Sequence, residues 1–501
     1  MASRPHRSDA ARIVAALERA VSRELPALLP RQRWFGDKGR PIGAVAIRDC
    51  AALGARGWLV LVDVTFAAGP DQTYAVPLVL GREGLAPGAL SMALEAAGAP
   101  ALALDAFDDP EFCRELLGAF ERRVTVPTCR DGVVRFVRTE RFPADAAAHA
   151  PRRLTGEQSN TSVIYGASLV FKAIRRIRPG IAIDCEVGAF LTSRARFAHV
   201  PPLAGAIEYA PASGPVTTLG VLQGYVANHG DGWSWVTAHL KNLPPERVDA
   251  LSDDVFRELR GLGAITGELH GALACDPGDA DFSPEPIAAA DAAAWSARVV
   301  DDVGHTCERV RGRLSTLPPE LAAGARALVA NEAELVARAR DLEILGGQRG
   351  MKIRVHGDYH LGQTLRTEGG FVVLDFEGEP GRPAAEARRK QCALVDVAGM
   401  LRSLDYAVQA TLPPSGAAVE AGERWVGHAS ATFLDGYREA AARAPVPLLP
   451  ASPAAFARVL AAFELDKALY EVRYELDNRP AWLAVPLRGL GRLLARERLA
   501  S

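Results

Sequence analysis

The chain lacks the sequence features of an exported or membrane-bound protein. None of its stretches approaches the roughly 18 uninterrupted apolar residues of a membrane-spanning helix. Residues 1–12 carry charges, and no apolar segment of the signal-peptide kind follows them. We therefore expect neither export nor insertion into a membrane.

Cysteine is also sparse. The seven cysteines are scattered, odd in number and without a C-x-x-C pair, so their spacing indicates neither a zinc site nor a disulfide framework. A reducing cytoplasm is the simplest compartment for such a chain.

An excess of charge of one sign is missing too. The formal net charge is −2, which predicts no strong attraction for nucleic acid or for an anionic membrane. Any charge that binds phosphate must therefore be local.

The length of 501 residues predicts several packed parts rather than one core. Residues 1–120 begin with a helical pattern and continue with strand-like runs, which predicts a small α+β cap domain. Residues 121–226 combine short strands with one helix near residues 183–193, and residues 227–501 are mainly helical except for a strand, loop and strand region within 353–376. The predicted fold class is α+β. The strand-like runs are 44–48, 57–66, 73–80, 133–139, 162–165, 168–173 and 217–226.

The motif most specific for a chemical function lies at residues 355–363, V-H-G-D-Y-H-L-G-Q, and is followed at 371–377 by F-V-V-L-D-F-E. Phosphoryl transfer to a hydroxyl requires a carboxylate at the acceptor and a second acidic group on magnesium, with a polar side chain completing the metal shell. Asp358 suits the acceptor proton. Gln363 follows it at the five-residue spacing of the kinase catalytic loop, and Asp375 ends an apolar strand as the metal-binding Asp does. The alternative is that Asp358 and Asp375 are turn-capping acids at strand ends.

A candidate phosphate loop lies upstream at residues 156–162, G-E-Q-S-N-T-S, between two predicted strands. Small side chains with exposed amides and hydroxyls can cradle phosphates without three glycines. A polar hairpin turn would have the same composition, so this loop alone does not decide the function. The residues assigned to nucleotide binding here are Gln158, Ser159, Asn160, Thr161 and Ser162.

Lys172 stands on an apolar predicted strand, where an isolated ammonium is costly unless it is paired. Glu186, fourteen residues later on the next predicted helix, completes the lysine–glutamate pair that kinases use at the nucleotide phosphates. Asp184 is a nearby competitor for that pairing, and a surface lysine on an edge strand is the simpler alternative. Gln223 and Tyr225 end the last strand of this segment, where backbone groups can meet an adenine edge, although an ordinary strand end would look identical.

Residues 467–480, K-A-L-Y-E-V-R-Y-E-L-D-N-R-P, continue a helix with two stripes. One stripe is apolar and faces the core. The other, of polar and aromatic residues, has the same spacing but is shifted by one residue, which places it about 100° further around the helix. Such a stripe suits the wall of a cleft that reads sugar hydroxyls. The alternative is an i,i+4 pair between Arg473 and Asp477 with half-buried tyrosines. The core stripe is Leu465, Leu469, Val472 and Leu476, and the other is Asp466, Tyr470, Arg473 and Asp477.

These segments resemble a known family. The H-G-D-x-H motif is that of the aminoglycoside, choline and maltose kinases rather than of the H-R-D protein kinases. The Q-S-N-T-S loop, residues 467–480, residues 394–403 (L-V-D-V-A-G-M-L-R-S) and residues 31–40 (R-Q-R-W-F-G-D-K-G-R) are similar to maltokinase signatures, including those of maltokinase regions fused to trehalose synthase. The resemblance covers most of the chain.

The resemblance implies a bilobal, protein-kinase-like fold of the aminoglycoside phosphotransferase type with an N-terminal cap. Residues 121–226 would be the nucleotide-binding small lobe, and residues 227–501 the lobe with the catalytic loop and sugar site. The resemblance implies ATP and Mg²⁺ as cofactors, maltose as the substrate and maltose 1-phosphate as the product. It also implies a role in trehalose and α-glucan (glycogen) metabolism, with trehalose synthase as a candidate partner. In this scheme Asp358 is catalytic, and Gln363 and Asp375 bind the metal. The substrate-binding residues are His360, Glu377, Tyr470, Glu471, Arg473 and Tyr474.

Two positions depart from the family patterns, and several readings stay open. Gln363 replaces the more usual Asn, and Glu377 stands where protein kinases have Gly. For residues 31–40 we favour the role of a Trp/Phe staple of the cap. Asp396 is a helix cap or an acid that orients a loop, and a role in the active site is the alternative. The residues alone reach only Mg-dependent phosphotransfer to a small hydroxyl acceptor. The rivals are a related kinase for glucosamine or an aminoglycoside, and a catalytically silent partner module of a trehalose synthase.

Overall fold

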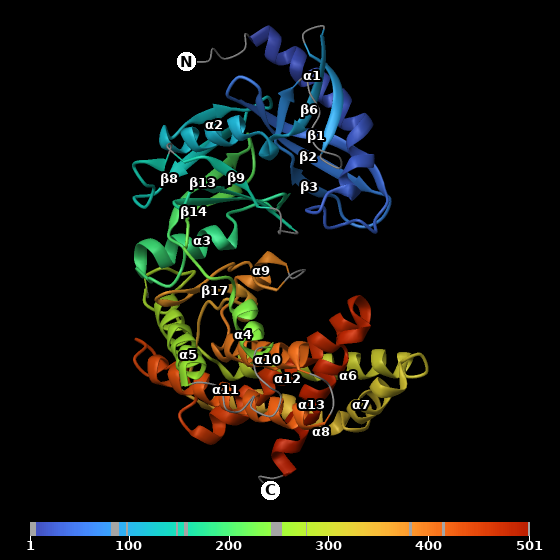
Figure 1. Cartoon of the computed structure of the whole chain (residues 1–501), viewed down its shortest axis with the longest axis vertical. Coiled ribbons are helices and arrows are strands. Elements are labelled where there is room, and N and C mark those ends of the chain that lie inside the picture. The colour runs from blue at the N-terminus through green and yellow to red at the C-terminus, as the bar shows by residue number, and fades with distance from the viewer. Residues whose placement is uncertain are drawn as a thin grey trace. The chain divides into compact units, whose positions relative to one another are not determined.

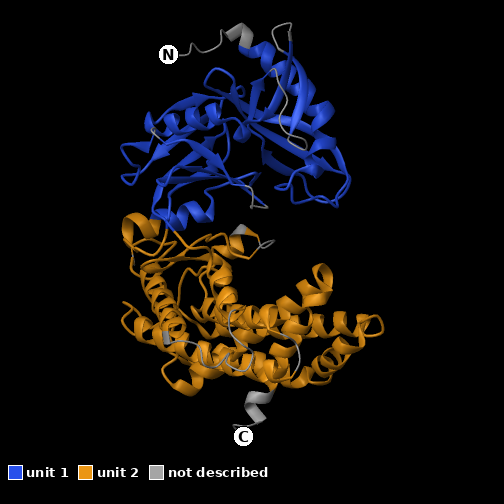
Figure 2. Ribbon diagram, viewed as in Figure 1, with its two compact units in different colours: residues 1–189, 201–227 blue, residues 190–200, 228–501 orange. Residues whose placement is uncertain are grey.

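The computed structural model describes residues 7–81, 90–96, 99–146, 149–154, 159–241, 253–276, 278–379, 383–412 and 416–498. The chain divides into two compact units, Met1–Ala189 with Pro201–Ala227 and Phe190–Val200 with Asn228–Ser501 (Figure 2). Gln158, predicted to contact the nucleotide, lies outside the described residues.

The first unit is built on two antiparallel sheets of seven strands each (Figure 1). In the first sheet the strand order is β12-β3-β2-β4-β6-β5, with β1 paired to β2. In the second sheet it is β7-β8-β13-β14-β11-β10-β9. The helices are α1 (Arg7–Leu28), α2 (Pro110–Glu121) and α3 (Ile183–Ala189). The strands are β1 (Ile42–Leu53), β2 (Gly57–Phe66), β3 (Gln72–Ala75), β4 (Leu78–Gly81), β5 (Ser91–Ala96), β6 (Ala99–Asp105), β7 (Thr125–Pro127), β8 (Val133–Arg138), β9 (Pro151–Arg153), β10 (Thr161–Tyr165), β11 (Leu169–Ala173), β12 (Arg176–Ile177), β13 (Leu203–Ala210) and β14 (Thr217–Gly224).

Helix α1 covers the first sheet through the apolar stripe that the sequence pattern predicts. Leu17, Val21 and Leu25 are fully buried in one core with residues of β1, β2 and β5. Because they are spaced by four residues, all three lie on one side of the helix, and this side packs against the sheet.

A buried arginine joins the two sheets of this unit. Arg175, between β11 and β12, is fully buried and bonds Asp105 at the end of β6 at 2.6 Å. Its Nε donates to Thr161 Oγ1 on β10 (2.9 Å), and its guanidinium lies 4.7 Å from the ring centre of Trp34. Trp34 and Phe35 are both buried, so the aromatic part of the 31–40 motif packs in the cap as the staple interpretation expects.

The second unit is mainly helical and contains one small hairpin, β17–β18 (Figure 1). A short π-helix spans Phe190–Arg194. Among the described residues of this unit, no helix is both long enough and apolar enough to span a membrane, and the same holds for the first unit. The helices are α4 (Gly232–Lys241), α5 (Asp253–Leu273), α6 (Ala289–Arg313), α7 (Pro319–Ala330), α8 (Glu332–Ala339), α9 (Ala384–Ala387), α10 (Leu394–Thr411), α11 (Ala417–Ala441), α12 (Pro453–Asn478) and α13 (Ala484–Arg498). The strands are β15 (Glu285–Pro286), β16 (Met351–Lys352), β17 (Thr364–Thr367) and β18 (Gly370–Val373).

Helices α5 and α11 pack closely because glycines lie between them. A Cβ on Gly263 would lie 2.0 Å from the carbonyl oxygen of Phe433, and one on Gly436 would lie 2.0 Å from that of Arg260. Either side chain would therefore push the helices apart.

Helix α12 begins at Pro453, where the preceding Ser452 side chain accepts a hydrogen bond from the Ala455 N–H. This N-cap and the proline at the first turn fix the start of the helix. Its predicted core stripe is buried, with Leu465, Leu469 and Val472 fully inaccessible. The faces of α12 beside this buried stripe do not belong to the core, so their side chains can take other roles.

The region predicted as strand, loop and strand within 353–376 is a loop followed by a hairpin. Ile353, directly after β16, makes only an isolated bridge to Gln391, and the two strands of the region, β17 and β18, both lie after the loop. The chain leaves an extended path at Gly357, whose φ of +82° is a left-handed conformation that glycine adopts without strain.

Candidate active site

The loop that carries Asp358 is held by a buried carboxylate. Asp396, in the first turn of α10, is 1% exposed. Its two oxygens accept hydrogen bonds from the backbone N–H groups of His356 and Gly357, each at 2.8 Å. Asp396 therefore orients the loop, which is one of the roles that the sequence left open for it.

His270 completes this buried support. Its Nε2 lies 3.1 Å from Asp396 Oδ2, and its Nδ1 lies 3.1 Å from the hydroxyl of Tyr437 on α11. Burial by itself would raise the pKa of Asp396, but the hydrogen bond from His270 and the neighbouring donors lower it. Sequence reasoning missed His270, because nothing in the pattern of α5 distinguishes it from a histidine that merely fills a core.

His356 ties the two acidic segments together. Its Nδ1 lies 3.3 Å from the backbone N–H of Asp358, and its Nε2 lies 2.7 Å from the carbonyl oxygen of Leu374. A single neutral tautomer satisfies both bonds, with Nδ1 accepting and Nε2 donating. The conformation of the loop around Asp358 is thereby coupled to the segment that leads into Asp375.

Asp358 faces two nitrogen groups. The ammonium of Lys467 on α12 lies 3.2 Å from Oδ1, and His360 Nε2 lies 3.8 Å from Oδ2. His360 Nδ1 accepts from the Gly362 N–H at 3.0 Å, which leaves the proton on Nε2, toward Asp358. Desolvation lowers the pKa of His360, although the charge of Asp358 opposes the change. A carboxylate with one oxygen beside a fixed cation is well placed to orient an acceptor hydroxyl.

Lys467 bridges Asp358 to a second carboxylate. Its Nζ lies 2.6 Å from Oε1 of Glu379, which is 7% exposed. Burial by itself would lower the pKa of Lys467, but the charges of Glu379 and Asp358 raise it, so the ammonium stays charged. Sequence reasoning placed Lys467 in a family signature but not in the site, and it missed Glu379. Only the folded chain brings these three groups together.

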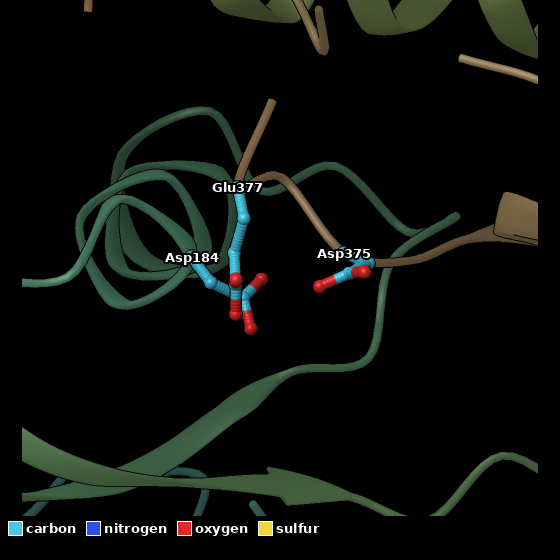
Figure 3. A group of neighbouring side chains, drawn as sticks. All are labelled: Asp184, Asp375 and Glu377. Carbon is cyan, nitrogen blue, oxygen red and sulfur yellow. The ribbon is translucent and has the colours of Figure 1, made fainter. Parts of the chain in front are cut away.

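Asp375, predicted to bind the metal, and Glu377, predicted to bind the substrate, both lie on the segment that follows β18. Asp375 has a φ of +62°, and the carboxylate oxygens of Asp375 and Glu377 come within 4.8 Å of one another. Gln363 Nε2 lies 3.5 Å from Asp375 Oδ2, and a flip of the amide would present its oxygen instead. Figure 3 shows Asp375 and Glu377 on this segment and labels Asp184 on α3, which belongs to the other unit. Carboxylate and amide oxygens are the donor set that suits Mg²⁺.

A pocket of about 50 Å³ opens beside the catalytic loop within the second unit. Its lining is strongly polar. Asp466, which lines it, is held by a two-pronged bond from Arg298 on α6, at 2.9 and 2.6 Å. The charged and aromatic side chains that line it are Arg298, Glu379, Glu386, Asp466, Lys467, Tyr359, Phe463 and Tyr470.

Helix α12 presents only some of its predicted sugar-binding residues to this pocket. Tyr470 lines it, and Tyr474 lies one turn further with its ring stacked on that of Tyr470, at 6.2 Å between ring centres. Glu471 is instead bound by Arg402 at 2.7 Å and is buried. We expect Tyr470 and Tyr474 to be the residues that meet a sugar, and a sugar-binding role for Glu471 would require it to leave Arg402.

Arg473 points toward α6. It donates to Thr306 Oγ1 at 2.8 Å and pairs with Asp302 at 3.2 Å. Asp477 pairs with Arg309, also on α6. The alternative interpretation, an i,i+4 pair between Arg473 and Asp477, is therefore wrong, because each side chain pairs with a residue of α6 instead. In each pair the long arginine side chain reaches the short aspartate of the other helix, and these bonds fasten α12 to α6.

The predicted nucleotide-binding residues of the first unit lie on adjacent strands. Ser162 on β10 is paired with Lys172 on β11, and the Lys172 ammonium lies 3.6 Å from Asp184 on α3. Asp184, weighed as the competitor of Glu186, is thus a partner of the lysine, and the role of Glu186 stays a prediction. Both carboxylates lie in the first turn of α3. Strand β10 begins at Thr161, directly after Ser159 and Asn160. Strand β14 ends at Gly224, which lies between Gln223 and Tyr225.

The support of the catalytic loop can be tested with Asp396→Asn. We expect a loss of about 3 kcal/mol in the free energy of unfolding, because an uncharged amide cannot accept both backbone hydrogen bonds and that of His270. Asp477→Asn, which breaks an exposed pair, is the matched control and should cost less than about 1 kcal/mol. Denaturant unfolding measures both values.

Because folding lowers the pKa of Asp396, its contribution is present at neutral pH and is lost as the pH falls below the pKa of an ordinary aspartate. Equal effects of the two variants would contradict the assigned role.

Comparison with known proteins agrees with this geometry. A family described as the maltokinase N-terminal cap domain matches residues 28–109. A glucosamine kinase of Streptacidiphilus jiangxiensis is 31% identical over 391 residues, which are 76% of this chain and 80% of that protein. A glucosamine kinase of Mycolicibacterium smegmatis (strain ATCC 700084 / mc(2)155) is 30% identical over 360 residues, or 70% of this chain and 81% of that protein.

A solved structure is also similar. Glucosamine kinase in complex with glucosamine, ADP and inorganic phosphate superposes with a TM-score of 0.67 at 25% identity, covering 95% of this chain and 99% of that one. The predicted α+β, kinase-like fold with an N-terminal cap domain is confirmed.

Proposed function

The chain belongs to the family of the glucosamine kinases, and we propose that it uses ATP to phosphorylate the anomeric hydroxyl of a neutral disaccharide, maltose, giving maltose 1-phosphate and ADP. Membership in the family makes the chain a kinase of the sugar or amino-sugar type that uses ATP. The maltokinase type of cap domain supports the narrower choice of maltose.

The observation that carries the choice is the position of Lys467. Its ammonium already neutralises Asp358, the candidate catalytic carboxylate, and Glu379, which lines the pocket. The protonated amine of an amino sugar placed there would meet a fixed positive charge and would find these carboxylates occupied, and like charges at close range repel. A neutral sugar has no such cost, and its hydroxyls can accept from the ammonium or donate to the carboxylates.

The two stacked tyrosines support a disaccharide over a single sugar ring. Tyr470 lines the pocket, whereas Tyr474 lies one turn away and is 42% exposed. Sugar rings have flat apolar faces that pack on aromatic side chains. A second ring that continues from the pocket would reach Tyr474 without any rearrangement of α12.

The proposed chemistry assigns one role to each group. Asp358 accepts the proton of the anomeric hydroxyl as the oxygen bonds to the γ-phosphorus of ATP and the bond to the β,γ-bridging oxygen breaks. Lys467 holds the carboxylate of Asp358 in place, and His360 lies beside its other oxygen. Asp375, Gln363 and Glu377 would hold Mg²⁺, which neutralises phosphate charge when bound. Lys172 would bind nucleotide phosphates.

Glucosamine is the second candidate, because the relatives above are named for it. A silent partner module of a trehalose synthase is a weaker candidate, since Asp358, Asp375 and Lys172 are all present. An aminoglycoside acceptor is weaker because residues 31–40 and 470–480 resemble maltokinase signatures. Association with a trehalose synthase stays a prediction.

A sugar panel separates the candidates. The purified chain would be assayed for ADP release with maltose, glucose, glucosamine and an aminoglycoside, and each product would be identified by NMR. We expect maltose to give the highest kcat/KM and phosphorylation at the anomeric position. A preference for glucosamine would overturn the maltose assignment. If no sugar of the panel causes release of ADP, the chain phosphorylates none of them.

Lys467→Met tests the charge argument directly. Removing the ammonium leaves Asp358 and Glu379 unneutralised, so we expect the ratio of kcat/KM for glucosamine to that for maltose to rise about 10-fold, or about 1.4 kcal/mol. Lys352→Met is a matched control, because Lys352 bridges Asp291 and Glu285 at a distinct place in the same unit and its side chain is 18% exposed against 19% for Lys467. An equal shift in the two variants would contradict the assignment.

Tyr474→Ala tests the second sugar ring. We expect KM for maltose to rise about 3- to 10-fold, in line with the 0.5–1.5 kcal/mol of an aromatic contact, while KM for glucose changes little. Tyr474→Phe keeps the ring and should behave like the wild type. A change that is the same for both sugars would place Tyr474 outside the sugar site.

A further inference from the structure

Two cysteines that lie far apart in the sequence meet in the first unit. Cys50 is on β1, and Cys129 is in the turn between β7 and β8. Their sulfur atoms are 3.0 Å apart although 79 positions separate them in the chain. Cys50 is 1% exposed, whereas Cys129 is exposed, so one thiol of the pair can be reached from solvent.

The backbone around the two thiols is held in place independently of them. The Cys129 N–H donates to the Cys50 carbonyl oxygen at 2.8 Å. The Arg130 N–H donates to Asp49 Oδ1 at 3.0 Å, and Asp49 Oδ2 accepts from the hydroxyl of Tyr209 at 2.9 Å. The turn is thus fastened to β1 on both sides of the sulfur atoms. To reach bonding distance the sulfurs need to approach by about 1 Å, which side-chain rotation can provide.

We propose that Cys50 and Cys129 are a modification site, at which a peroxide converts the two thiols into a reversible disulfide between β1 and the β7–β8 turn. The cysteine spacing alone indicated no such framework. The pairing depends on a tertiary contact that spacing does not contain.

The two thiols have different roles in this reaction. The hydrogen bond donated by Cys50 lowers the pKa of Cys129 and raises that of Cys50, so the exposed sulfur has the greater thiolate character. The Cys129 thiolate attacks one oxygen of the peroxide, a sulfur–oxygen bond forms, and the other oxygen leaves as hydroxide. The sulfur of Cys50 then attacks the sulfenic sulfur, the S–S bond forms, and water leaves with the proton of Cys50. In total, two thiols and one hydrogen peroxide give one disulfide and two waters.

Oxidation has a predictable effect on the fold. The new bond would link a strand of the first sheet to a turn of the second and would close a long loop in the unfolded chain. We expect the melting temperature of the oxidised chain to rise by several degrees. A thiol reductant should reverse the change.

The experiment uses the full chain, reduced, desalted and treated with hydrogen peroxide at increasing doses. Non-reducing peptide mapping should show one cross-linked pair that contains Cys50 and Cys129, and titration should show the loss of two thiols. Cys275→Ser is the matched control, because Cys275 is the other exposed cysteine of the chain, and this variant should oxidise like the wild type. In Cys50→Ser, Cys129 should stop at a sulfenic acid that dimedone traps.

Two outcomes overturn the proposal. One is a wild-type map without the Cys50–Cys129 peptide at doses that already oxidise Cys275. The other is a Cys129 thiol that reacts no faster than Cys275. Both measurements use the wild-type chain, so they do not depend on whether a cysteine variant folds.

Discussion

Asp358→Asn should abolish phosphorylation of the sugar while leaving nucleotide binding within a few-fold of the wild type. The amide has the size of the carboxylate but does not take up the proton of the acceptor hydroxyl, and positioned proton transfer contributes about 10²- to 10⁴-fold to turnover. Lys467 keeps its 2.6 Å bond to Glu379 in this variant, so the surrounding pocket should stay assembled.

Asp435→Asn on α11 is the control for this experiment, because it makes the same chemical change at an exposed aspartate. It should retain full activity. Turnover would be measured by ADP release and nucleotide binding by calorimetry. If Asp358→Asn works within a few-fold of the wild type, Asp358 does not act on the acceptor.

The second large effect is expected from Asp375→Asn, which should weaken the binding of Mg²⁺ together with ATP. A neutral amide replaces a charged oxygen ligand of a hard cation. Loss of a ligand should cost at least the roughly 10- to 100-fold in metal affinity that outer-shell partners of a metal site contribute. Asn is the right substitution, because Asp375 has a φ of +62° and asparagine tolerates this conformation, whereas a larger change would add backbone strain.

The readout for Asp375→Asn is a magnesium titration at fixed ATP, with Asp435→Asn again as the control. We expect a higher magnesium requirement and a strongly reduced turnover, at an unchanged melting temperature. An unchanged magnesium requirement would remove Asp375 from the metal site. The two variants differ in which reactant they affect, because Asp358 serves the acceptor and Asp375 the nucleotide.

Much of the local structure follows from short-range pattern. Leu17, Val21 and Leu25 recur at helical spacing, and they form the buried face of α1. Leu465, Leu469 and Val472 do the same in α12. Such stripes are readable because an apolar face must be buried whatever it packs against.

The sequence also carries the order of the chemical groups. Asp358, Gln363 and Asp375 are close in the chain, joined by one loop and one hairpin, so their spacing constrains their geometry. Nothing similar marks His270 or Glu379, whose partners lie 126 and 88 positions away.

The sequence by itself determined the α+β class, the cap and the acidic motif, because these depend on periodicity and on spacing within short segments, and its resemblance to a known family added the kinase-like fold. Only the tertiary structure decided which charges neutralise one another. It placed Lys467 between Asp358 and Glu379, turned Glu471 to Arg402 and Arg473 to Asp302, and brought Cys50 against Cys129. The reason is physical: a long side chain can reach several partners, and the partner it meets depends on how distant helices and strands pack, which local spacing does not specify.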